Sequence, residues 1–106
     1  MNKLTNVFVV LKNLNDGFDS KEIYYFSESD FDIVLNRIED LGAGVNGIEP
    51  WLNGKFYDVL GFEDYNTIAT DPKWYRKAFF EFKQNGKPLL YAASYSVPEK
   101  LFNNKL

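Results

Sequence analysis

The sequence predicts an α+β domain in which an antiparallel sheet of two or three hairpins packs against one main amphipathic helix. Two observations lead to this prediction. Two Asn-Gly pairs, Asn53-Gly54 and Asn85-Gly86, suggest turns between apolar runs, and residues 29–41 carry one clear helical pattern. The 106 residues suffice for one hydrophobic core, so we expect a single domain over residues 1–106.

Asn85-Gly86 gives the first hairpin signal, because a type I′ turn requires positive φ at both central residues and Asn-Gly tolerates it. The strands on either side then pair in a register that gathers apolar side chains on one face. The facing pairs are Phe82 with Leu89, Phe80 with Tyr91, and Ala78 with Ala93. Phe80 is therefore expected in the core.

A helix over residues 72–83 is the alternative interpretation of the same segment. Pro72 suits a first helical turn, and Gly86 lies just past the end. Apolar residues also recur at the spacing of one helix face: Trp74, Ala78 and Phe82. We favour the hairpin because both of its arms pair cleanly and because the phenylalanines of this segment prefer strands.

Asn53-Gly54 predicts a second, shorter hairpin for the same reason. A two-residue loop places Trp51 opposite Phe56, which is an attractive aromatic pair. The same register places Glu49 opposite Asp58. Two facing carboxylates repel each other unless they reach water or a cation.

Residues 29–41 form the clearest helix of the chain. Ser29 or Ser27 could cap its N-terminus, and Gly42 or Gly44 could end it. Its apolar face is Phe31, Val34, Leu35, Ile38 and Leu41. The acidic residues outside that face are Asp32, Glu39 and Asp40.

Further segments complete the prediction. The apolar runs at residues 6–11 and 22–26 are expected as two antiparallel strands. Residues 61–72 lack a sustained period and predict a long loop, and loops of that length often carry function. Residues 98–102 are expected to form a short terminal helix.

Composition excludes several kinds of chemistry. The chain has no cysteine and no histidine, which removes disulfides, thiol nucleophiles, imidazole bases and the commonest metal ligand. Its glycines match no phosphate loop or dinucleotide fingerprint. Glu49 and Asp58 form the best remaining acid/base pair, and a hydrolase using them is our third hypothesis. We expect no enzyme, no cofactor and no metal.

Charge is distributed unevenly. Residues 13–72 hold 13 acidic and three basic residues, a net charge of −10, whereas residues 73–106 hold seven basic and two acidic residues. The basic part could stack on nucleic acid, but the acidic part would repel phosphates. We therefore expect no nucleic-acid partner. We also expect no membrane partner and a cytoplasmic location, because no apolar run approaches membrane-spanning length.

Acidic side chains alternate with aromatic ones in the middle of the chain, and this pattern is the candidate binding surface. Rings supply affinity and charges speed association, so the pattern suits the capture of a basic protein. Trp51 and Phe56 are interpreted as core residues, and the tyrosines and Phe62 as exposed. The predicted partner-binding residues are Glu49, Tyr57, Asp58, Phe62, Glu63, Asp64 and Tyr65.

A small, acidic, aromatic-rich and cysteine-free domain of this kind resembles the immunity proteins of bacterial toxin systems, particularly contact-dependent growth-inhibition systems. The tracts at residues 47–51 (Gly-Ile-Glu-Pro-Trp) and 69–75 (Ala-Thr-Asp-Pro-Lys-Trp-Tyr) contribute to the resemblance. It is one of general character over the whole chain and assigns no functional residue. It implies a cytoplasmic inhibitor that binds one cognate toxin, often a nuclease with a basic groove, and blocks it.

A function of a different class remains open, namely a small-ligand-binding domain with an aromatic pocket between helix and sheet. Such a domain would show a closed apolar pocket with few polar groups. An inhibitor would instead bind a basic protein toxin tightly and turn over nothing. For the inhibitor we expect a monomer or a weak homodimer.

Overall fold

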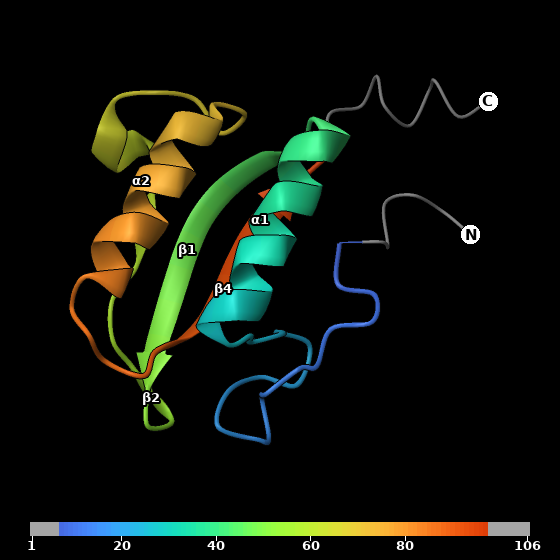
Figure 1. Ribbon diagram of the computed structural model, residues 1–106, viewed down its shortest axis with the longest axis vertical. Coiled ribbons are helices and arrows are strands. Elements are labelled where there is room, and N and C mark those ends of the chain that lie inside the picture. The colour runs from blue at the N-terminus through green and yellow to red at the C-terminus, as the bar shows by residue number, and fades with distance from the viewer. Residues whose placement is uncertain (1–6, 98–106) are drawn as a thin grey trace.

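The computed structural model describes residues 7–97, which form one antiparallel sheet of four strands and two α-helices (Figure 1). This architecture confirms the predicted α+β fold class. In chain order the elements are α1 (Glu28–Leu41), β1 (Gly44–Leu52), β2 (Lys55–Phe56), β3 (Leu60–Gly61), the 3₁₀ helix η2 (Phe62–Tyr65), α2 (Pro72–Lys83) and β4 (Leu90–Ser96).

The sheet is arranged around β1. On one side β4 pairs with almost the whole of β1, with Glu49 opposite Ala92. On the other side β3 pairs with the middle of β1, and β2 pairs with its C-terminal end. A bulge between Val45 and Gly47 shifts the β1–β4 register once.

The helix α1 confirms the predicted amphipathic helix. Ser27, one of the two candidate caps, stands at its N-terminus and accepts a hydrogen bond from the backbone N–H of Asp30. Gly42 ends the helix in the left-handed conformation, with φ of 76°. Its fully buried side chains are Phe31, Val34, Leu35 and Ile38.

The hairpin predicted at Asn85-Gly86 is wrong, because residues 72–83 form the helix α2. Asp71 caps this helix by accepting from the N–H of Lys73, and the following proline occupies its first turn. The buried face of α2 is Trp74, Tyr75, Ala78, Phe79 and Phe82. Phe80 points away from that face and is 56% exposed, so its expected place in the core is also wrong.

The hairpin predicted at Asn53-Gly54 is confirmed. Both turn residues have positive φ, 53° and 76°, as a type I′ turn requires. Trp51 pairs with Phe56, and their ring centroids lie 6.5 Å apart in an edge-on contact.

The predicted pairing of Glu49 with Asp58 is wrong. The strand β2 ends at Phe56, and the next two N–H groups of the chain both point to the carbonyl oxygen of Pro50. Glu49 lies opposite Ala92 of β4 instead. Glu49 and Asp58 therefore do not face each other, and the pair of carboxylates that the hydrolase hypothesis requires is not formed.

The two strands predicted near the N-terminus are wrong. Residues 7–23 form turns, bends and irregular backbone, and Val10 is 92% exposed with a left-handed φ of 70°. Within residues 7–27, only Phe26 bridges to the sheet, through both backbone hydrogen bonds with Tyr91. The loop predicted over residues 61–72 is interrupted by η2. The terminal helix predicted at residues 98–102 lies outside the described residues.

The core lies between the two helices and one face of the sheet, and Figure 1 shows α1 and α2 side by side over β1 and β4. The Tyr91 ring is central: its centroid lies 5.2 Å from that of Phe31 and 5.0 Å from that of Phe79. Phe82 completes the layer at 6.4 Å. Side chains therefore fill the space that a ligand pocket between helix and sheet would need.

Arg76 ties α2 to the exposed side of α1. Its guanidinium lies 3.3 Å from a carboxylate oxygen of Asp32 and 3.1 Å from one of Glu39, and it also donates to Asn36. Both carboxylates lie outside the core, as the helical pattern predicted.

Candidate functional site

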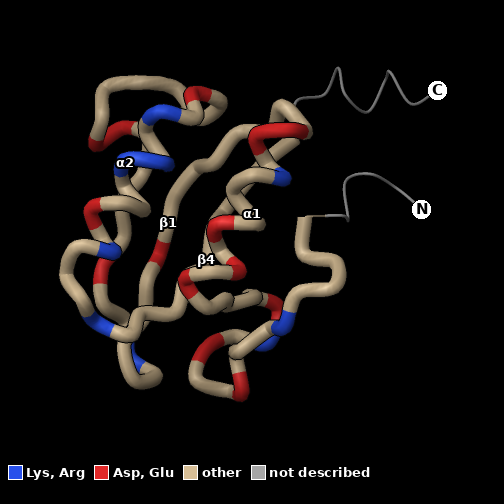
Figure 2. Tube along the Cα trace, in the orientation of Figure 1, with Lys and Arg blue, Asp and Glu red and all other residues tan. Residues whose placement is uncertain are grey.

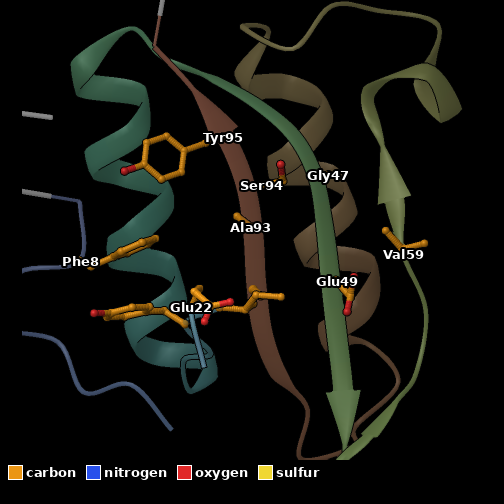
Figure 3. Close-up of a pocket in the computed structure, with 11 residues that line it drawn as sticks. Phe8, Glu22, Gly47, Glu49, Val59, Ala93, Ser94 and Tyr95 are labelled. Atoms are coloured by element: carbon orange, nitrogen blue, oxygen red, sulfur yellow. The ribbon is translucent and has the colours of Figure 1, made fainter. Parts of the chain in front are cut away.

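Neither described helix covers the second face of the sheet, and this face carries a groove. Side chains alternate along a strand, so Gly47, Glu49 and Trp51 of β1 point away from the layer that contains Tyr91. Across from them on β4 lie the small residues of the groove floor, Ala92 and Ser94. The groove has a volume of about 440 Å³ and spans both strands (Figure 3).

The groove has apolar walls. On one side stand Ile23 and Tyr24, and the Tyr24 ring is 42% exposed and stacks on Phe8 with centroids 5.1 Å apart. On the other side stands Val59, which is 49% exposed. Figure 3 shows Phe8 and Val59 on opposite sides of the paired strands. The described lining contains two carboxylates, Glu22 and Glu49, and neither lysine nor arginine.

The Glu49 carboxylate is held in a fixed position at this groove. Its Oε2 accepts a hydrogen bond of 2.6 Å from the indole N–H of Trp51 and one of 3.0 Å from the hydroxyl of Tyr25. Both rings are held by contact with Phe18, at centroid distances of 5.3 Å and 5.0 Å. This aromatic triad covers one end of the open face, and Glu49 stands at its border with the groove.

The Tyr25 hydroxyl also lies 2.7 Å from a carboxylate oxygen of Asp19. Burial raises the pKa of Tyr25 far above its ordinary value near 10, and the hydrogen bonds to Asp19 and Glu49 raise this pKa further. The hydroxyl therefore keeps its proton at neutral pH. One proton serves only one acceptor at a time, so two carboxylates share a single donor here.

Asparagine side chains build the loop that supplies Asp19 and Tyr25. The side-chain amide of Asn15 donates to the carbonyl oxygens of Ser20 and Ile23, each at 2.9 Å. Asn13 accepts from the N–H of Tyr25 at 3.0 Å. The sequence analysis missed Asp19, Glu22 and Tyr25 as site residues. No local pattern could have found them, because they meet Glu49 only through the fold.

Three of the predicted binding residues lie exposed along the β2–η2 side of the sheet: Asp58, Glu63 and Asp64. Asp58 accepts from the N–H of Val59, and Asp64 accepts from the N–H of Gly61, both at 2.8 Å. A Cβ added at Gly61 would lie 2.8 Å from Glu63 Oε1, so this carboxylate lies over Gly61. Among the described residues none of the three forms an ion pair.

The predicted aromatic anchors are less exposed than expected. Tyr57, Phe62 and Tyr65 are all partly buried and pack against the core. The Tyr65 hydroxyl donates to Glu81 at 2.6 Å, and burial together with Glu81 raises the pKa of Tyr65. Phe56 shows the reverse: it was interpreted as core and is 56% exposed. Tyr65 is covered by side chains of α2, the segment that the sequence analysis predicted as a strand.

The predicted site is thus divided. The structure brings Glu49 together with Asp19, Glu22 and Tyr25 at the groove, and it leaves the other acidic residues along the adjoining side of the sheet. Figure 2 shows basic residues following the trace of α2, and acidic residues on the loop before α1 and near η2. We use "acidic face" for the groove residues Glu22 and Glu49 together with Asp58, Glu63 and Asp64.

The sequence matches no protein-family model, and no similar protein was found among curated proteins or solved structures. No helix in the described part of the chain is long and apolar enough to cross a membrane. Within residues 7–97, no three side chains of the metal-ligating types gather closely enough to hold a metal ion.

Proposed function

We propose that this chain is a non-enzymatic protein-binding module that captures a basic protein partner on its acidic face. One observation carries the proposal: on the open face of the sheet and its adjoining β2–η2 side, exposed apolar side chains lie near carboxylates that form no ion pair with the described residues. Val59 and Tyr24 supply apolar surface, while the two ion pairs within residues 7–97 both belong to Arg76, away from this face. Such a surface combines attraction at long range with burial at contact.

The resemblance to immunity proteins gives the proposal its specific form. The partner is then a bacterial toxin with a basic active-site surface, such as a nuclease with a basic substrate groove, and the chain neutralises it by covering that surface. An acidic face without internal cations supports this role, because its charges stay available to the partner. The filled space between helices and sheet gives the ligand-binding alternative no comparable support.

The test is association kinetics against the candidate toxin, the protein encoded directly upstream of this chain. Raising ionic strength from 0.01 M to 0.1 M shortens the Debye length from about 30 Å to about 10 Å. The association rate should fall by roughly one to three decades, while dissociation changes much less. Reversing Glu63 and Asp64 to Lys should also slow association.

A matched control reverses two acidic residues outside the acidic face, Glu28 and Asp40, which are exposed on α1. This variant has the same net charge as the Glu63→Lys/Asp64→Lys variant, so a purely global charge effect would slow both equally. If the association rate changed neither with salt concentration nor with the Glu63/Asp64 reversal, the acidic face would be ruled out as the docking surface.

A further inference from the structure

The floor of the groove leaves room that a sheet face normally fills with side chains. Gly47, Ala92 and Ser94 project little or nothing above the paired strands. A Cβ added at Gly47 would meet only the carbonyl oxygen of Leu60 at 3.5 Å and a methyl carbon of Val59 at 3.9 Å. These are ordinary contact distances, so strand packing does not itself require a glycine at this position. The space is open to a guest.

The charge of the groove indicates which kind of chemical group would bind in it. Glu22 and Glu49 line it, Asp19 stands behind Glu49 across the Tyr25 hydroxyl, and no basic side chain of the described lining balances them. Low-dielectric walls on both sides concentrate the field of these carboxylates. A cationic group entering from a partner would therefore be attracted to Glu49.

The hydrogen bonds of Glu49 determine how a guest would meet it. Both bonds from the protein, from Trp51 and from Tyr25, end on Oε2. Within the described residues Oε1 accepts none, so this oxygen remains for the guest while the other holds the carboxylate in place. A pre-oriented acceptor loses little side-chain freedom on binding.

We propose that the groove is the pocket for an arginine side chain of the protein partner, with the guanidinium bonded to Glu49 Oε1. This inference rests on the proposed function and names the residue that the acidic face recognises. Arginine fits better than lysine because its planar guanidinium is weakly hydrated and stacks on aromatic rings. The exposed Tyr24 ring in the groove wall supplies such a surface.

The first experiment titrates the ¹⁵N-labelled chain with the peptide Gly-Arg-Gly at low salt and follows amide and indole signals. The Trp51 indole N–H and the Gly47 and Ser94 amides should shift most, and Gly-Lys-Gly should shift them less. Glu49→Gln should abolish the shifts, because it removes the charge but keeps an oxygen that accepts from Trp51. Glu28→Gln, the same change on α1, should preserve them.

A second variant tests the groove independently in case Glu49→Gln does not fold. Ser94→Val fills the floor of the groove and leaves the carboxylates in place, and a valine suits a strand. It should weaken the arginine-dependent shifts as well. Equal shifts with the arginine and lysine peptides, or shifts that survive both Glu49→Gln and Ser94→Val, would overturn the arginine pocket.

Kinetics with the candidate toxin separate this inference from the proposed function. Glu49→Gln should increase the dissociation rate at least about tenfold, because it removes the negative charge that pairs with the partner's buried guanidinium. If association remained salt-dependent but Glu49→Gln dissociated at the wild-type rate, the arginine pocket would be refuted and the proposed function would still hold. Specific binding of the arginine peptide without any toxin binding would refute the toxin partner and support the pocket.

Discussion

The two faces of the sheet differ in what their tyrosines do. On the helix-covered face, Tyr91 is fully buried among phenylalanine rings, and its hydroxyl has no hydrogen-bond partner among the described residues. On the open face, Tyr25 is equally buried, but its hydroxyl lies between the carboxylates of Asp19 and Glu49. One face thus uses the ring alone, and the other uses ring and hydroxyl together.

This difference separates the face that stabilises the fold from the face that we propose for binding. The covered face is filled by large apolar side chains, whose burial is the main stabilising contribution to folding. The open face has a floor of small residues and an oriented carboxylate, which contribute less to the core and form the proposed binding surface. Changes on the two faces should accordingly differ in their effects on stability and on binding.

The largest effect is expected from Phe79→Ala on the covered face. The Phe79 ring is 2% exposed and contacts both Phe31 and Tyr91, so its removal leaves a cavity in the aromatic layer. The free energy of unfolding should fall by about 3–5 kcal/mol. Urea denaturation followed by circular dichroism measures this loss. A decrease below about 1 kcal/mol would mean that the layer is not the core.

Tyr25→Phe should have an intermediate effect. The change keeps the ring and removes a hydroxyl that donates to charged acceptors, whose hydrogen bonds contribute about 1.5–3 kcal/mol. The unfolding free energy should decrease by a value in or just below that range, and the Trp51 fluorescence should change because Glu49 loses one of its two donors. Wild-type stability with unchanged fluorescence would show that the hydroxyl does not orient Glu49.

Tyr91→Phe makes the same chemical change on the covered face, and the opposite sign is expected. Its hydroxyl is buried without a partner among the described residues, so removing it relieves a desolvation cost. The unfolding free energy should stay the same or rise by up to about 1 kcal/mol. If both tyrosine variants lost the same stability, the contrast between the two faces would not hold.

The smallest effect is expected from Phe80→Ala. This ring is next to Phe79 in sequence but lies on the solvent side of α2. Its removal should change the unfolding free energy by less than about 1 kcal/mol, as for ordinary surface substitutions. The adjacent Phe79→Ala variant serves as its comparison in the same denaturation series. A loss as large as that of Phe79→Ala would return Phe80 to the core and reinstate the hairpin register.

Part of the fold could be predicted because its signals are local. The helix α1 has a serine cap, a terminal glycine and an apolar face, and all three lie within residues 27–42. The Asn53-Gly54 turn and the Trp51–Phe56 pair likewise depend on residues close in sequence. The absence of cysteine and histidine also limits the available chemistry, whatever fold the chain adopts.

The candidate site could be predicted only in part. The sequence identified Glu49 and the exposed acidic residues Asp58, Glu63 and Asp64. It could not show that Glu49 meets Tyr25, since that hydrogen bond joins residues 24 positions apart. The groove also depends on small residues that face each other across β1 and β4, and their register is fixed by tertiary pairing.

The Asn-Gly pairs at the two predicted turns show most directly what the sequence determined and what only the tertiary structure decided. At Asn53-Gly54 both residues adopt positive φ and form the predicted hairpin, whereas at Asn85-Gly86 only the glycine does, with φ of 67°. There the local turn preference competes with a capped helix that buries five side chains, including Trp74 and Phe79, against the sheet. Burial of that aromatic face outweighs the turn preference, because each large apolar side chain contributes about 1.5–3 kcal/mol. That burial requires α1 and β4 in place, so residues 72–83 become a helix only in the context of the whole fold.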